Sequence, residues 1–359
     1  MLIVYGISSV LIALRLVRTT DEKVRAIKKI KVFLTIKLFL NVIVSYSFVF
    51  FMKRMGLITG IGVVILPAVI SFVFSSLDSL ALYCPVKRIR NLECGRKEYY
   101  RQVVGDNLIL YLSWIAASLF FAASKVMKIE TDGYGDIIIY IIFWVLFNYA
   151  VMFIRKYTMK CKPYSNEKLV KISEEYKIEG YKIYEYDGKS RKTANAMVDS
   201  FLGAGNIYFS DYLLDNLSEE EVKAIYLHEK GHIEKRHILI RNILLFLTMP
   251  FMFCVGIIMD EVEEVFHMEI NIAFGIILGM SILILYMVFF GLYVSRTQEY
   301  GADAYAASYM EDKTILCEAL RKLNRLNDIL EAEDEVAVLK THPTVEKRIK
   351  RIMNEGKEN

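Results

Sequence analysis

Several features are scarce or missing in this sequence of 359 residues, and each absence excludes a class of protein. The five cysteines are Cys84, Cys94, Cys161, Cys254 and Cys317. They are odd in number and lack the spacing of metal ligands, so we expect reduced thiols and neither a disulfide framework nor a cysteine-based zinc site. The net charge of +4 is small, and no basic stripe alternates with aromatic residues, which argues against a nucleic-acid partner. We find no internal repeat or low-complexity tract.

Hydrophobic residues, in contrast, are abundant. They make up 55% of the chain, and the mean hydropathy is +0.33, above the values of ordinary soluble proteins. They gather in seven apolar blocks at 1–17, 32–52, 57–85, 103–123, 137–154, 238–259 and 272–294. Most blocks reach the ~20 residues that a helix needs to cross a bilayer. The sequence therefore predicts a multi-pass α-helical membrane protein with about seven spans.

Two blocks need separate comment. The block at 1–17 has no basic region before it and no small-residue cleavage site, which favours a retained span over a removed signal peptide. The block at 57–85 is long and contains Pro67. It could form one kinked span, or a span followed by an interfacial piece.

The charges of the connecting segments predict the orientation of the chain. Segments 18–31 and 86–102 each carry six Lys or Arg residues, whereas segment 124–136 carries two and segment 260–271 none. Basic loops stay on the cytosolic side of a membrane, so the N-terminus is expected outside and the polar regions 155–237 and 295–359 inside. We expect the plasma membrane in a prokaryote, or the endoplasmic reticulum in a eukaryote.

This orientation divides the chain into four regions. Residues 1–154 hold five spans, 155–237 form a cytosolic catalytic region, 238–294 hold two spans, and 295–359 form a second cytosolic region. Within the catalytic region we expect a helix at 166–176 and strands at 181–186, 194–201 and 206–209, which together make a small curled sheet. The predicted fold of this unit is an α+β arrangement.

The strongest motif is His228-Glu229-Lys230-Gly231-His232. Two histidines four residues apart on a helix lie on the same face, so both imidazoles can bind one zinc ion. Glu229 follows the first ligand and is the candidate general base for a water that attacks a peptide carbonyl. The alternative is a solvated helix face that carries two histidines by chance.

The residues before this motif predict that it lies on a helix. Ser218 and Glu221 have the spacing of a capping box, and Leu217 and Val222 can form a hydrophobic staple. Charged residues at Ser218–Glu221 and at Glu234-Lys235-Arg236 flank the motif. They argue against a site-2-type intramembrane protease, in which the motif lies within an apolar span.

A third metal ligand is predicted in the segment that follows the last apolar block. Glu299 is the candidate, and Asp303 shares its helix face at the i+4 position. Asp303 could accept a hydrogen bond from a ligand imidazole and fix its tautomer. The alternative is an ordinary juxtamembrane helix with an Arg296–Glu299 ion pair.

The sequence resembles the membrane zinc peptidases that include the type I CaaX prenyl endopeptidase and the heat-shock protease HtpX. The matching stretches are Asn195-Ala196, the run from Leu217 to His237, the segment Ser295 to Asp303, and Thr341-His342-Pro343 with Arg348. The resemblance covers 160–359 by motif and the whole chain by topology. The sequence departs from the family pattern at Lys230, where the family usually has an apolar residue. The chain is also shorter than typical prenyl endopeptidases.

The resemblance implies a zincin-like α+β fold for the catalytic unit, one bound zinc ion and roles for further residues. Asn195 would lie on an edge strand that pairs with extended substrate, and His342 would stabilise the oxyanion near the metal. Arg348 would anchor the C-terminal segment near the bound substrate. His237 matches the family pattern, but at ~100° per residue it would lie opposite His228 on a continuous helix, so it is not expected to be a ligand.

Taken together, these residues predict a zinc-dependent endopeptidase that cleaves membrane-associated or prenylated CaaX-type polypeptides at the cytosolic face of the bilayer. Two alternatives remain open from the sequence. One is a quality-control protease of misfolded membrane proteins. The other is a catalytically idle membrane scaffold that retains a zinc site, against which the intact Glu229 argues.

Overall fold

The structure is a computed structural model that describes residues 23–58, 61–108, 111, 134–266, 282, 285–286, 291–327 and 343–354. The described residues form two compact units. The first comprises those within 1–162 together with 186–193, and the second those within 163–185 and 194–359. The predicted spans at 1–17, 103–123 and 272–294 lie wholly or mostly outside the described residues and stay predictions.

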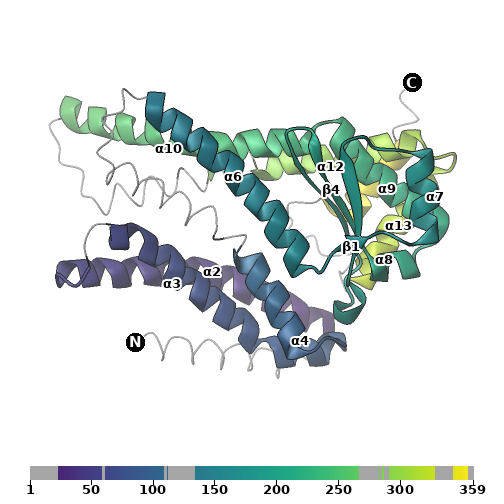
Figure 1. The fold of residues 1–359 in the computed structure, drawn as a ribbon, viewed down its shortest axis with the longest axis horizontal. Helices are drawn as coiled ribbons and strands as arrows, with labels where there is room; N and C mark the ends of the chain where they lie inside the picture. Colours follow the sequence, from purple (N-terminus) through teal and green to yellow (C-terminus); the bar gives the residue numbers. More distant parts are fainter. Residues whose placement is uncertain are drawn as a thin grey trace. The chain divides into compact units, whose positions relative to one another are not determined.

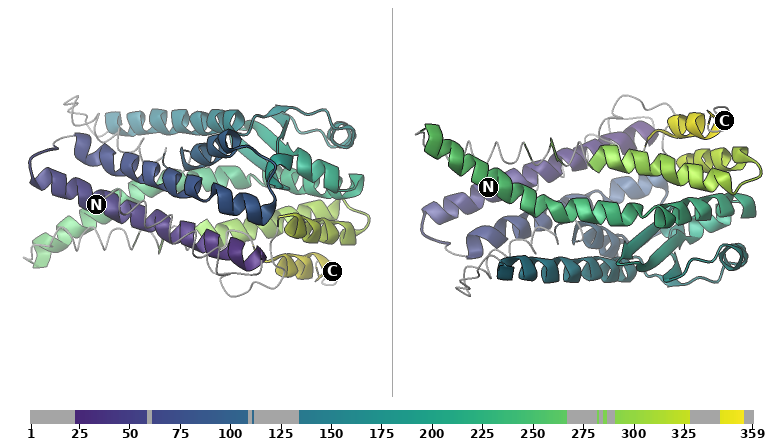
Figure 2. Two further views of the ribbon diagram at one scale, coloured as in Figure 1. Left: turned by 90° about the horizontal axis from the view of Figure 1, so that it is seen from below. Right: turned by 90° about the horizontal axis from the view of Figure 1, so that it is seen from above.

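The first unit is helical. Its main helices are α2 (Lys23–Arg54), α3 (Ile61–Ala81), α4 (Tyr83–Arg90) and α6 (Tyr134–Thr158). Helices α2 and α3 lie side by side in both views (Figures 1 and 2). Pro67 lies within α3, yet the helix continues past it. The chain bends instead at Leu82, where 65–81 and 83–90 meet at 43°, so the block at 57–85 is a long helix followed by a short one.

A buried polar cluster joins α2 to α3. The Lys37 Nζ atom lies 3.6 Å from Asp78 Oδ2, and the Asn41 side chain donates to the same oxygen at 3.1 Å and to Ser75 Oγ at 3.1 Å. All four side chains are buried. Asp78 is therefore paired inside the helical unit, as a carboxylate in an apolar environment must be.

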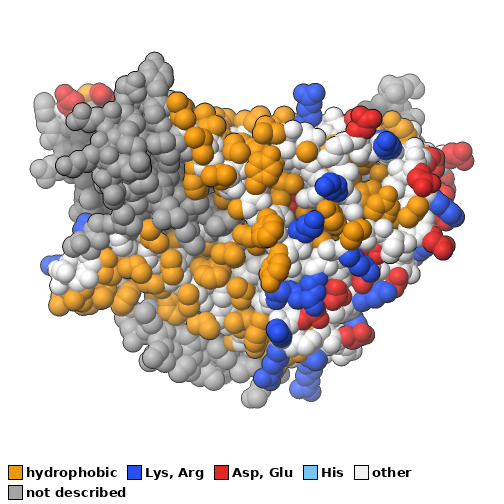
Figure 3. All heavy atoms as spheres, in the orientation of Figure 1, with side chains coloured by type: hydrophobic (Ala, Val, Ile, Leu, Met, Phe, Trp, Pro, Cys, Tyr) orange, Lys and Arg blue, Asp and Glu red, His pale blue; other side chains and the backbone are white. Residues whose placement is uncertain are grey.

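Large hydrophobic side chains cover the outer faces of these helices (Figure 3). On α2 and α6, for example, Phe50 is 62% exposed and Phe153 70%. Such extended apolar surface favours contact with lipid or another apolar partner over water. Among the described residues, 141–158 is long and apolar enough to cross a membrane, and the bent pair 65–81 with 83–90 is a second candidate.

The second unit contains a four-stranded sheet with the order β1-β2-β4-β3. The strands are β1 (Lys162–Pro163), β2 (Tyr181–Tyr186), β3 (Ala196–Phe201) and β4 (Ala204–Ser210). The three predicted strands are confirmed, but β4 begins earlier than expected. The reason is a tight turn at Leu202 and Gly203, both with positive φ, which leaves Ala204 free to pair with Phe201.

Helices pack around this sheet and form the core of the second unit (Figure 1). They are α7 (Glu167–Glu175), α8 (Asp211–Asn216), α9 (Glu219–Glu234), α10 (His237–Phe266), α12 (Tyr293–Ser308), α13 (Lys313–Leu326) and α14 (Val345–Asn354). Fully buried side chains such as Phe209, Val222 and Leu316 come from sequence-distant elements and make one core. Helix α9 crosses this core, so its polar side chains are held in an apolar surrounding.

Candidate metal centre

The helix that carries the main motif begins as the sequence predicts. The Ser218 Oγ atom accepts a hydrogen bond from the Glu221 backbone N–H at 3.2 Å, and Glu221 Oε2 accepts one from the Ser218 N–H at 2.7 Å. Leu217 and Val222 are both buried beside this cap. The cap fixes the first turn of α9, and such caps stabilise a helix by about 1 kcal/mol.

Lys322 of α13 reinforces the cap, a contact that the sequence did not indicate. Its Nζ atom donates to Glu221 Oε2 at 2.8 Å. Burial raises the pKa of Glu221, but the hydrogen bonds from Lys322 and Ser218 outweigh it, so the net effect lowers the pKa below its ordinary value of 4.5.

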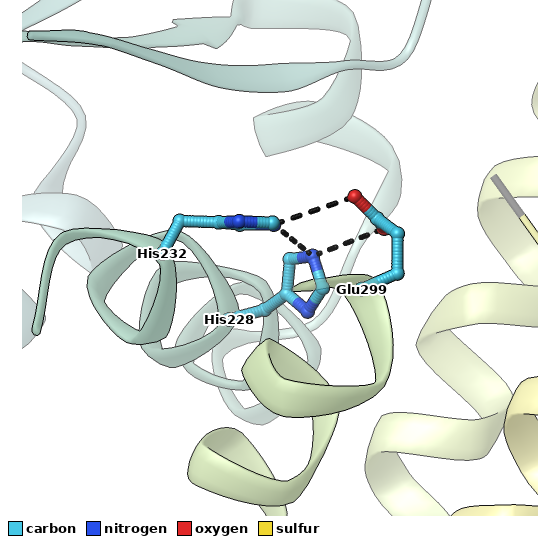
Figure 4. Close-up of side chains that lie close together, drawn as sticks. All are labelled: His228, His232 and Glu299. Carbon is cyan, nitrogen blue, oxygen red and sulfur yellow. Dashed lines mark hydrogen bonds and ion pairs between the residues drawn. The ribbon is translucent and has the colours of Figure 1, made fainter. Parts of the chain in front are cut away.

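His228 and His232 lie one turn apart on α9, both buried, with their Nε2 atoms 3.2 Å apart. Burial and the neighbouring His228 lower the pKa of His232 to about 2, so this imidazole is neutral, as a metal ligand must be. The two side chains converge from the same helix face (Figure 4).

Glu299 reaches these histidines from α12, which packs along α9. Its Oε2 atom lies 3.7 Å from His228 Nε2 and its Oε1 atom 3.5 Å from His232 Nε2 (Figure 4). Gly231 allows this close packing. A Cβ atom there would lie 3.1 Å from the Ala302 Cα atom and 3.0 Å from the Tyr305 Cβ atom.

The three side chains fit a divalent metal. One ligand atom from each of His228, His232 and Glu299 can be chosen so that all lie within 4.8 Å of one another, and all three side chains are buried. Tetrahedral zinc with bonds of about 2.0–2.1 Å needs ligand atoms roughly 3.3–3.4 Å apart, close to the observed spacing. Two imidazoles and one carboxylate are also the ligand set of many hydrolytic zinc sites, which keep a fourth position open.

Asp303 supports the first ligand. Its Oδ1 atom lies 3.0 Å from His228 Nδ1, so the imidazole Nδ1–H donates to the carboxylate and leaves Nε2 free to bind a metal. Arg348 of α14 holds Asp303 in place: its Nε atom donates to Oδ2 at 2.7 Å and Nη2 to Oδ1 at 2.6 Å. Burial raises the pKa of Asp303, but Arg348 outweighs burial, so the carboxylate stays ionised.

Glu229 is buried on α9 next to the first ligand. Burial raises the pKa of this carboxyl, the neighbouring His228 lowers it, and the Glu299 carboxylate raises it again; the net direction is upward. A carboxylate with a raised pKa is a better proton acceptor from water, as a general base must be.

The remaining predicted residues lie in different surroundings. Asn195 is exposed and lies immediately before the edge strand β3. His342 lies outside the described residues, and Pro343 after it is buried. Lys230, the departure from the family pattern, reaches the backbone oxygens of Tyr176 and Lys177 at 3.4 and 3.3 Å. It thus stabilises the C-terminal end of α7 away from the ligands.

His237 is not among the three ligands, as predicted, but it does not lie on a continuation of the helix opposite His228. The extrapolation assumed a continuous helix, but α9 ends at Glu234 and a new helix begins at His237. Arg236 between them has a φ of 53°, a left-handed conformation that ends the helix.

The fold and the ligand set define a metallopeptidase. The chain belongs to peptidase family M48, whose sequence pattern matches residues 162–355. It is 30% identical over 169 residues to a protease HtpX homolog of Helicobacter acinonychis (strain Sheeba), which covers 40% of this chain and 51% of the relative. A homolog of Helicobacter pylori (strain Shi470) is 29% identical over 169 residues, with the same coverage. The chain thus spans about half the length of these relatives.

A solved structure shares the fold. The crystal structure of S. mikatae Ste24p superposes with a TM-score of 0.63 at 18% sequence identity, over 98% of this chain and 96% of that one. The likeness therefore extends beyond the catalytic region to the helices of the first unit.

Proposed function

We propose that this chain is a zinc-dependent endopeptidase that hydrolyses membrane-associated or prenylated polypeptides at the cytosolic face of a membrane. The observation that carries the proposal is the convergence of His228, His232 and Glu299 beside the buried Glu229. Two imidazoles and a carboxylate with an adjacent carboxylate base are the parts that hydrolysis of a peptide bond needs.

Zinc suits both the ligands and the reaction, because it accepts imidazole and carboxylate ligands and hydrolysis needs no change of oxidation state. A bound ion would polarise the scissile carbonyl and acidify the attacking water. Glu229 would take a proton from the attacking water as the water oxygen bonds to the carbonyl carbon. The same carboxyl then delivers the proton to the amine as the carbon–nitrogen bond breaks, so it ends the cycle ionised.

Asp303 and Arg348 would act through the ligands. Asp303 holds the His228 ring with Nε2 towards the metal, and Arg348 holds Asp303 with two hydrogen bonds. The Arg348 Nη1 atom also lies 3.5 Å from Glu299 Oε2. We infer that Arg348 positions two elements of the site and does not itself bind substrate, because its guanidinium is buried against these carboxylates.

The edge strand β3 would bind the substrate backbone. Strand β3 is the last in the sheet order, and it packs against α9. Asn195 faces Ser210: its N–H donates to Ser210 Oγ at 3.0 Å, and its carbonyl accepts from the Ser210 N–H at 3.0 Å. In an antiparallel pair the backbone groups of successive residues point to opposite sides. The backbone N–H and C=O groups of Ala196 and Val198 therefore point away from β4. An extended peptide on that open side of β3 can pair with them.

The length of this open edge is limited by α10. The Ser200 carbonyl would be the next group to face an incoming strand, but it accepts a hydrogen bond from Asn242 Nδ2 at 3.1 Å. A substrate strand would thus pair with β3 around Ala196 and Val198. Asn195 would mark the start of this segment.

His342 is proposed to stabilise the oxyanion of the reaction, as the family resemblance implies. It immediately precedes Pro343 and lies six residues before Arg348. Arg348 bonds to Asp303 beside the ligands, which supports a place for this segment at the site.

A membrane location is supported by the apolar surface of the first unit and by the likeness to Ste24p. We propose an integral membrane protein with the N-terminus outside and the catalytic unit in the cytosol, on the basis of the loop charges. The substrate classes in this proposal, membrane-associated and prenylated polypeptides, come from the resemblance of the sequence motifs to the membrane zinc peptidases.

The test uses the purified full chain with zinc and two substrates, an unstructured protein and a farnesylated CaaX peptide. Cleavage of either one, with loss of cleavage in Glu229→Gln and retained zinc, supports the proposal. Equal cleavage by Glu229→Gln contradicts it. Stoichiometric zinc without cleavage of any peptide would favour an idle scaffold.

A further inference from the structure

His237 lies just beyond the end of the helix that carries both histidine ligands. The chain turns sharply at Lys235 and Arg236, where the left-handed Arg236 allows α10 to begin immediately. This turn brings the His237 side chain back against the last turn of α9. The histidine is buried, with an exposed fraction of 6%, equal to that of His232.

The two imidazoles are in direct contact. The Nδ1 atom of His237 lies 3.0 Å from the Nδ1 atom of His232, and the rings meet nearly edge to face, with centroids 5.1 Å apart and an angle of 75°. The Nε2 atom of His232 faces the other direction, 3.5 Å from Glu299 Oε1. The Nε2 atom of His232 thus faces the metal site, and its Nδ1 atom contacts His237.

This contact fixes the hydrogen positions on both rings. A nitrogen that binds a metal must be unprotonated, so His232 carries its hydrogen on Nδ1. That hydrogen can be donated only to a lone pair, so Nδ1 of His237 must be the acceptor. His237 then carries its own hydrogen on Nε2.

Two residues of helix α12, one before and one after Glu299 in the sequence, lie against His237. Gln298 Nε2 donates to the His237 backbone carbonyl at 3.0 Å. Gly301 leaves room for the ring, because a Cβ atom there would lie 3.2 Å from His237 Cε1 and 3.3 Å from Nε2. The residues next to the third ligand therefore position the partner of the second one.

We propose that His237 is a positioning residue, the hydrogen-bond acceptor that orients His232 towards the metal. His237 accepts a hydrogen bond from His232 as Asp303 does from His228, but its acceptor is a neutral nitrogen and not a carboxylate. The inference rests on the proposed metal site. Outer partners of this kind typically contribute 10- to 100-fold to metal affinity.

Two substitutions separate the hydrogen bond from the space that the ring fills. In His237→Asn the amide oxygen can occupy the place of Nδ1 and accept from His232, whereas in His237→Gln the amide extends to the place of Nε2 and leaves Nδ1 unmatched. We expect the zinc affinity, measured by chelator competition on the full-length protein, to fall about 10- to 100-fold in His237→Gln and to stay within a few-fold of wild type in His237→Asn.

The visible spectrum of the cobalt-loaded protein gives a second readout that does not depend on activity. We expect altered ligand-field bands in His237→Gln and bands close to wild type in His237→Asn. Equal zinc affinity and equal cobalt spectra in the two variants would overturn the proposal, whether both are weakened or both unchanged. Gly301→Ala provides an independent check with His237 intact, because the added methyl would displace the ring. It too should lower the zinc affinity, and unchanged affinity would count against the proposal.

These outcomes are distinct from failure of the proposed function. A wild-type protein that binds no stoichiometric zinc refutes the metal site itself. A wild-type protein that binds zinc, with Asn and Gln variants that bind it equally, refutes only the role of His237.

Discussion

Arg348 donates two hydrogen bonds of 2.6 and 2.7 Å to Asp303, and both side chains are buried beside His228. Paired in this way, the two charges offset each other's desolvation. The pair joins α14 to α12, and through Asp303 it reaches the metal ligand. The C-terminal helix is thus a structural part of the site.

The first prediction follows from this pair. Arg348→Leu would leave the buried Asp303 carboxylate without its cationic partner, and loss of one partner of a buried ion pair typically costs about 3–5 kcal/mol. We expect a lower thermal unfolding midpoint and weaker zinc binding, measured on the same preparation. The control is Lys350→Leu, an exposed cation on the same helix, which should change neither quantity appreciably. Similar effects of the two substitutions would contradict the role of the pair.

The second prediction concerns the general base. Glu229→Gln removes the proton acceptor but no metal ligand, so kcat should fall by about 10²–10⁴-fold while zinc affinity is retained. The control is Glu234→Gln, an exposed position at the end of the same helix, which should leave kcat unchanged. Loss of zinc in Glu229→Gln would mean that the carboxylate has a structural role.

The third prediction tests the open edge of β3. Val198→Pro removes an N–H group that points away from β4, so the β3–β4 ladder should survive. We expect KM for an extended peptide to rise several-fold without loss of zinc. Val198→Ala, which keeps the N–H group, should behave like the wild type. Met197→Pro, which removes a group facing β4, should destabilise the fold. An unchanged KM in Val198→Pro would argue against pairing of the substrate with β3.

The fourth prediction concerns pH. The folded state lowers the pKa of Glu221, so this group stabilises the fold above its ordinary pKa of 4.5, and the stabilisation is lost as the pH falls through the lowered folded value. Unfolding midpoints of wild type and Glu221→Gln should therefore differ most near neutral pH, by the equivalent of about 1 kcal/mol, and converge in acid. A difference that persists unchanged below pH 3 would contradict this role.

Much of the site could be predicted from the sequence because its signals are local. The capping box at Ser218 and the four-residue spacing of His228 and His232 depend on one helix, and the structure has both. Glu299 required a long-range inference from the position of its segment after the last apolar block, and its carboxylate lies with the two histidines.

What could not be predicted depends on contacts between distant elements or on a single backbone angle. The left-handed Arg236 that ends α9 redirects His237, and no periodicity argument anticipates it. The hydrogen bonds from Arg348 to Asp303 and from Lys322 to Glu221 likewise form only when helices distant in sequence pack together. Gly231 could have been noticed, since a glycine within a buried helix indicates close approach of another backbone.

The most direct test of the metal centre is the zinc content of the purified full-length protein, measured by mass spectrometry for the wild type and for Glu299→Ala. We predict one zinc ion per wild-type chain and a loss of most of it in Glu299→Ala, which lacks the ligand from α12. Wild-type protein that holds no zinc, or Glu299→Ala protein that holds as much as the wild type with the same affinity, would contradict a site built from these three side chains.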